Sequence, residues 1–335
     1  MIVDRGGGVV SPGETLTEVE WTRALDDTST ARVVLNPDGD CCERLGRVRS
    51  WRHSLHIYRD GVFVWGGPIL QAEWSLGQVE IWAGDVLSWL DRRVPHQSMA
   101  FGESDLTDIA AWLIEDGFAP DDPGHVVETV APAGVRGARR YRRDVGQTGD
   151  HLRDLAETGL DYTAVGDRII LLPETWTQSV GHLSDADLPE GLVVAEDGTA
   201  LASRWIVAGD DEGDVLSEAG DTDPYYGLLE RYVEQTSIPD DASAAEAARS
   251  KLRSSLPVPV FIDTQEVTIS PEAAVAVPLL VPGWCLDITS AQTCRTITQR
   301  LKIVGLKVVE DGGSGDTPGS EKVQVQVAAS GAEAG

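Results

Sequence analysis

The framework of the chain follows from residues 54–65, which read Ser54-Leu55-His56-Ile57-Tyr58-Arg59-Asp60-Gly61-Val62-Phe63-Val64-Trp65. Asp-Gly between two alternating runs is typical of a type I′ hairpin turn, because both central residues of that turn take positive φ. We therefore predict an antiparallel hairpin at these residues.

Similar short strands surround the hairpin. Period-two alternation predicts strands at 16–21, 31–35, 69–76 and 79–82, and Asn36-Pro37-Asp38-Gly39 and Gly77-Gln78 are turn sequences. Asp85 can cap a short helix over 86–92. Short strands joined by tight turns are typical of a small antiparallel barrel, which we place at residues 1–94.

The pattern changes after Pro95. Ser104 or Asp105 can cap a helix that carries an apolar stripe from Leu106 to Ile114 and ends at Gly117. A second helix is predicted over 148–158 and a hairpin over 161–172. Residues 95–190 are therefore predicted to form an α+β module.

Strands return in residues 191–328. They are expected at 192–195, 201–208, 260–269, 284–289, 295–309 and 322–327, with a helix over 242–255 and another over 225–233. Residues 329–335 are expected to fray. The predicted fold class is mainly β, with two small antiparallel β-barrel domains flanking the α+β module.

Charge restricts the function. The 335-residue chain has 27 Lys and Arg against 55 Asp and Glu, which gives a net charge of −28. Such a polyanion repels nucleic acid phosphates and anionic lipids. No apolar run is long enough to span a bilayer, and the N-terminus lacks the pattern of a secretion signal, so we expect synthesis in a cytoplasm and no membrane insertion.

Catalytic motifs are not evident, and we predict no enzyme activity, no cofactor and no metal. The six histidines (His53, His56, His96, His125, His151 and His182) lack metal-ligand spacing, and Gly6-Gly7-Gly8 neither follows a strand nor opens a helix. No G-x-S-x-G motif marks a nucleophile.

The four cysteines do not form a disulfide framework. Cys41 and Cys42 are adjacent, and a disulfide between them would be strained. Cys285 and Cys294 are expected to be free thiols, although a disulfide between them across a hairpin stays open.

Paired carboxylates offer the best alternative chemistry. Glu115-Asp116, Asp121-Asp122 and Asp210-Asp211-Glu212 have the residue types that a glycosidase uses. The acidic loop 210–223, with Asp214, Asp221 and Asp223, contains oxygen ligands suited to calcium but lacks EF-hand spacing. In so acidic a chain, solvated loops and faces are the expected role of these groups.

Two other clusters suggest contacts. Arg136, Arg139, Arg140, Arg142 and Arg143 form a basic patch, which we expect to pair with carboxylates of a neighbouring domain or subunit. Trp21, Trp65, Trp74, Trp82 and Trp205 fall in predicted strands, where core or subunit contacts are the first interpretation and sugar stacking the alternative.

Residues 48–69 resemble minor tail proteins of long non-contractile-tailed phages of actinobacteria. Those proteins often have a similar Arg-Asp-Gly turn, here Arg59 to Gly61, followed by a strand like Val64-Trp65-Gly66-Gly67-Pro68-Ile69. The segments 226–230, 242–255 and 281–283 and the pair Cys294-Arg295 resemble the same family's second half. Such proteins are similar to the baseplate hub of contractile tails.

The resemblance implies a structural protein of the virion, assembled in the host cytoplasm. It implies a homotrimer whose six barrels cap a six-fold tail tube at the tail tip. Expected partners are the distal tail protein, the tape measure protein and tip or fibre proteins, with genomic DNA as a passing, repelled cargo. A hexameric distal tail protein, a carbohydrate-binding adhesion protein and a hydrolase using Glu115 or Asp116 stay as alternatives.

Overall fold

The computed structural model describes residues 1–13, 15–37, 40–196, 198–199, 201–209, 215–235, 241–255, 260–262, 265–291, 294–312 and 319–329. The chain folds into two compact units. The first contains residues 1–191, 264–292 and 298–335, and the second contains residues 192–263 and 293–297. No described helix is long and apolar enough to cross a bilayer.

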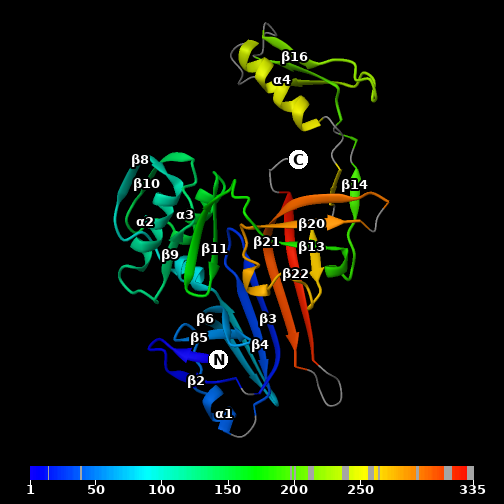
Figure 1. Ribbon diagram of the computed structural model, residues 1–335. Helices are drawn as coiled ribbons and strands as arrows, with labels where there is room; N and C mark the ends of the chain where they lie inside the picture. Colours follow the sequence, from blue (N-terminus) through cyan, green and yellow to red (C-terminus); the bar gives the residue numbers. More distant parts are fainter. Residues whose placement is uncertain are drawn as a thin grey trace. The chain divides into compact units, whose positions relative to one another are not determined.

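A twelve-stranded sheet is the framework of the first unit (Figure 1). Its N-terminal strands are β1 (Ile2–Asp4), β2 (Val9–Ser11), β3 (Leu16–Ala24), β4 (Thr30–Leu35), β5 (His53–Arg59), β6 (Val62–Ser75) and β7 (Gln78–Gly84). Its other strands are β13 (Ser179–Ser184), β19 (Glu266–Ile269), β20 (Cys285–Ser290), β21 (Ile297–Asp311) and β22 (Ser320–Ala329). The short helix α1 (Asp40–Leu45) follows β4.

The predicted hairpin is confirmed: β5 and β6 pair antiparallel around Asp60 and Gly61, which both have positive φ. β6 continues beyond the prediction, because residues 62–68 pair with β5 and residues 69–75 pair with β7. The strand passes from one partner to the other at Gly66-Gly67-Pro68. A Cβ on Gly67 would overlap the backbone of Gly84, so this close approach requires glycine.

Strands from the two ends of the sequence join in this sheet. β21 pairs antiparallel with β3 along residues 305–311, and β22 returns beside β21. The mainly-β fold class with an α+β insert is confirmed. The described strands form no closed barrel, because their ladder runs on from the N-terminal strands into the C-terminal ones. The division of the chain at residues 94, 190 and 328 stays a prediction.

The α+β module also belongs to the first unit. It contains α2 (Leu106–Phe118), α3 (Thr148–Ala156), the ribbon of β8 (Met99–Asp105) and β10 (Arg136–Tyr141), and the sheet of β9 (Val126–Thr129), β12 (Arg168–Pro173) and β11 (Leu160–Val165). Asp105 caps α2 through the N–H of Thr107, as predicted. The core lies around the apolar face of α2, and the 3-10 helix η1 (Val86–Arg92), capped by Asp85, packs against it.

The second unit is a smaller sandwich. α4 (Asp241–Ser255) covers one face of a sheet with the order β16 (Leu216–Gly220), β15 (Arg204–Ala208) and β17 (Glu230–Glu234), and β14 (Val194–Glu196) pairs with β18 (Val260–Ile262). Its main buried cluster is Val207, Ala219, Ala244 and Ala248.

The helix predicted over 225–233 is wrong. Asp223 instead accepts hydrogen bonds from the backbone N–H groups of Tyr225 and Tyr226, and Gly227 has positive φ, so these residues form a turn. The following strand β17 pairs in parallel with β15. The hydrogen bonds of this ladder therefore pair the backbone N–H and C=O groups that a helix would have paired internally.

Candidate functional site

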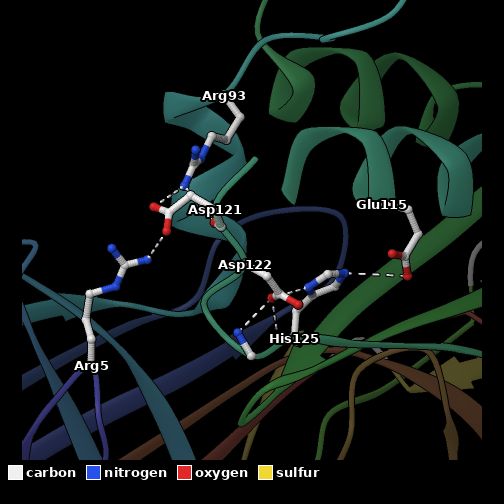
Figure 2. Close-up of polar contacts among 7 residues, drawn as sticks. Arg5, Arg93, Glu115, Asp121, Asp122 and His125 are labelled. Atoms are coloured by element: carbon white, nitrogen blue, oxygen red, sulfur yellow. Dashed lines mark hydrogen bonds and ion pairs between the residues drawn. The ribbon is translucent and has the colours of Figure 1, made fainter. Parts of the chain in front are cut away.

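Asp121 binds two arginines from distant parts of the first unit (Figure 2). Its carboxylate lies 2.8 Å from Arg5 Nη2 and 3.1 Å from Arg93 Nη2. The hydrogen bonds from these guanidinium groups lower the pKa of Asp121. The segment after α2 is thereby connected to the loop after β1 and to the end of η1.

The neighbouring Asp122 has different partners. Its Oδ1 accepts hydrogen bonds from the backbone N–H groups of Gly124 and His125 and lies 2.7 Å from His125 Nδ1. Burial acts to raise the pKa of Asp122, but these bonds lower it below the usual value. His125 Nε2 lies 3.5 Å from Glu115 Oε1, so the ring stands between two carboxylates, as Figure 2 shows.

Asp116 is buried, and its Oδ2 accepts from the N–H groups of His96, at 2.6 Å, and Gln97. It therefore holds the loop after η1 against α2. Of the four carboxylates that sequence reasoning singled out in this module, Asp116 and Asp121 join separate elements of the module and its surroundings. Asp122 closes the turn before β9, and Glu115 shares His125 with it.

The structure describes only part of the acidic loop 210–223, for which the sequence offered calcium binding as an alternative. Asp210, Asp211, Glu212 and Asp214 lie outside the described residues. Asp221 accepts from the backbone N–H of Thr222, and Asp223 forms the turn before β17. Among the described residues, no group of three or more His, Cys, Asp and Glu side chains is arranged to hold a metal ion.

The other sequence candidates are spread over the molecule. His53 is buried, and burial lowers its pKa and that of His56. Cys285 is a buried free thiol and Cys294 an exposed one, so the two do not form a disulfide. The Cys41 side chain lies outside the described residues.

The tryptophans divide between core and surface. Trp21 and Trp65 are each only 2% exposed, and Trp82 and Trp205 are half-buried. Trp74 is 50% exposed at the end of β6, although its Nε1 donates to the carbonyl of Leu45. The core interpretation therefore holds for the first two.

Two buried cations were not anticipated from the sequence. Arg23 donates to the carbonyl oxygens of Val64, Pro278 and Leu280. These bonds join β3 and β6 to the 3-10 helix η3 (Val277–Leu279), which precedes β20. Alternation along β3 could have placed Arg23, because it shares the inward face of Trp21. Lys302 pairs with Asp161 in the interior and joins β21 to β11. The sequence feature that could have indicated this buried pair is the position of Lys302 among the apolar residues of β21.

Several solved structures are similar to this chain over nearly its whole length. A scan of protein-family models and a search of curated proteins find no match. The 43 kDa tail protein of prophage MuSo2 from Shewanella oneidensis matches with a TM-score of 0.56 and 12% identity over 94% of each chain. A tail protein from Neisseria meningitidis MC58 matches with a TM-score of 0.53 and 12% identity, over 93% of this chain and 92% of that one.

A third match comes from a different kind of particle. The Escherichia coli c3393 protein, described as a component of the type VI secretion system similar to the phage T4 tail proteins gp27 and gp5, aligns with a TM-score of 0.53 and 12% identity. The alignment covers 98% of this chain and 76% of that one. This chain therefore has the fold of phage tail proteins.

Proposed function

We propose that this chain is a structural hub protein at the tip of a phage tail. The observation that carries the proposal is the match along 94% of both chains to a prophage tail protein. A match of this extent includes the sheet and the inserted module together. The sequence resemblance of residues 48–69 supports a long non-contractile tail as the particle.

The proposed assembly is a homotrimer in the virion, built in the host cytoplasm. Each chain would contribute its N-terminal and C-terminal β regions to a ring with pseudo-six-fold symmetry, which caps the tail tube. The β3–β21 ladder supports this arrangement, because it makes both regions parts of one sheet. The proposed neighbours are the distal tail protein, the tape measure protein and tip or fibre proteins.

The charge fits a DNA conduit. A net charge of −28 repels phosphates and offers few contacts that release counterions, so DNA could pass without binding. The cross-linking roles of Asp116 and Asp121 and the turn contacts of Asp122 favour a structural protein over a hydrolase.

A second candidate is the corresponding hub of a tail-like secretion machine. The match to the Escherichia coli protein favours it, because that protein is described as part of a type VI secretion system. The two candidates differ in the particle that contains the chain. Immunogold labelling of isolated particles would place a phage hub at the tip of tails attached to DNA-filled heads, and a secretion hub on headless tubes.

Light scattering with negative-stain images of the same peak tests the assembly. We expect a trimeric ring with six-fold-looking density. A hexamer would indicate a distal tail protein instead. If the protein is a monomer and its tryptophan emission shifts when polysaccharide is added, an adhesion protein is indicated. Clearing of peptidoglycan that is lost on Glu115→Gln would contradict the structural role.

A further inference from the structure

The basic patch lies on an outer strand of the α+β module. Arg136, Arg139 and Arg140 belong to β10, and Arg142 and Arg143 follow it; these five residues are called the arginine strip below. Burial alternates along β10, so that Arg136 and Arg140 are exposed while Tyr141 is buried. Among the described strands, β10 pairs only with β8 (Figure 1). Four of the five arginines of the strip are therefore exposed to solvent, and Arg139 is half-buried.

Three of the five arginines of the strip have no side-chain partner among the described residues. Arg139 donates to Thr158 Oγ1, and Arg143 lies 3.3 Å from Asp144. In the described part of the chain, Arg136, Arg140 and Arg142 make no hydrogen bond or ion pair through their side chains. The contrast within the module is clear, because Arg153 binds Asp150 and Asp91, and Arg168 binds Glu128.

The composition makes the absence of partners notable. Residues 101–200 contain twenty acidic and seven basic residues, and five of those seven are in the strip. Like charges held this close repel one another unless an anionic surface neutralises them. Carboxylates are abundant in this stretch, yet among the described residues only Arg143 of the strip pairs with one, which indicates a partner outside the chain.

The same module also exposes the complementary charge. Glu103, Asp108 and Glu157 are exposed, and no cation pairs with them among the described residues. A second copy of the chain would therefore bring carboxylates to the strip, while its own strip would stay available for a third copy. Contacts of this head-to-tail kind form a ring when the rotation from one copy to the next closes.

We propose that the arginine strip binds carboxylates of a second copy of this chain and orients neighbouring copies in the ring. The inference deepens the proposed function and rests on it, since it identifies a contact between subunits of the hub. Exposed ion pairs contribute little affinity individually, but a row of them sets orientation and speeds association. Self-association should therefore weaken as salt rises.

Analytical ultracentrifugation at 50 and 500 mM salt tests the proposal. The strip variant contains Arg136→Glu, Arg140→Glu and Arg142→Glu. The control contains Arg47→Glu, Arg49→Glu and Arg52→Glu, which changes the net charge equally at exposed residues outside the strip. We expect roughly tenfold or more weaker self-association for the strip variant alone, and loss of the salt dependence.

The other outcomes overturn the proposal in distinguishable ways. If both variants assemble as the parent does, the strip is not at the contact, while the hub function stands. If the parent is monomeric at 50 mM salt but is found at tail tips, the partner is not a second copy. Binding of a fluorescent DNA duplex by the parent and not by the strip variant would identify nucleic acid as the partner.

A cross-linking experiment identifies the acidic face. Arg140→Lys keeps the positive charge and introduces an amine that a carbodiimide joins to a carboxylate in direct contact. Mixing isotope-labelled and unlabelled copies distinguishes links between copies from links within one. We expect mixed-isotope links from Lys at position 140, and links within single copies alone would contradict the proposal.

Discussion

At the scale of single residues, Arg23 connects segments that are far apart in the sequence. The residue is 1% exposed, its guanidinium lies over the ring of Trp21, and burial lowers its pKa to about 10. Arg23→Met leaves the carbonyl groups of Val64, Pro278 and Leu280 without this donor. We expect a loss of about 3 kcal/mol or more in the free energy of unfolding, measured with urea. Arg47→Met, at an exposed ion pair, is the control, and an equal midpoint for both variants would contradict the argument.

Asp26 gives a prediction about pH. Burial raises the pKa of its carboxyl to about 7, although a hydrogen bond from the Tyr162 backbone N–H opposes the shift. Because the unfolded value is near 4, the folded chain binds this proton more tightly. The contribution to stability is therefore full below about pH 4 and is lost as pH rises through 7.

Asp26→Asn should remove this dependence. The amide oxygen can still accept from Tyr162, and Asn tolerates the positive φ of this position. We expect the variant to be more stable than the parent at pH 8 by about 1 kcal/mol or more, and no more stable than the parent at pH 4. Asp60→Asn, exposed and also at positive φ, is the matched control. Parallel stability curves for parent and Asp26→Asn would show that burial does not perturb this carboxyl.

At the scale of elements, the bend in β6 explains the motif Val64-Trp65-Gly66-Gly67-Pro68-Ile69. The strand can serve both β5 and β7 only if Gly67 approaches the backbone at Gly84. Gly67→Ala should therefore cost about 3 kcal/mol or leave the protein insoluble, because the obstacle is backbone that cannot move aside. Gly102→Ala, in β8 with open space around it, should be tolerated. Thermal unfolding and soluble yield compare the two, and equal tolerance would refute the role of the bend.

The same elements show what the sequence can reveal. Asp60-Gly61 specified its hairpin and Asp105 its helix cap, because both signals depend on neighbours in the chain. The sequence does not predict the continuity of β6, because Gly-Gly-Pro is also typical of a turn. The β3–β21 ladder and the Arg5–Asp121 ion pair join residues more than a hundred positions apart, and no local pattern encodes such pairings.

At the scale of the whole molecule, the two units should differ in stability. The second unit has a main cluster of four buried side chains, whereas the cluster around α2 contains many more. A small core leaves little stabilisation after the cost of ordering the chain. We therefore expect the second unit to unfold first on heating.

Trp205 makes this expectation measurable, because it is the only tryptophan of the second unit. Its Nε1 donates to Ser255 Oγ at 2.7 Å, so its emission depends on α4 remaining packed against β15. The difference between the fluorescence melts of the parent and Trp205→Phe reports the second unit, while far-UV circular dichroism reports mainly the larger sheet. A lower midpoint for the difference signal is the expected result. Coincident midpoints would mean that the two units unfold as one cooperative structure.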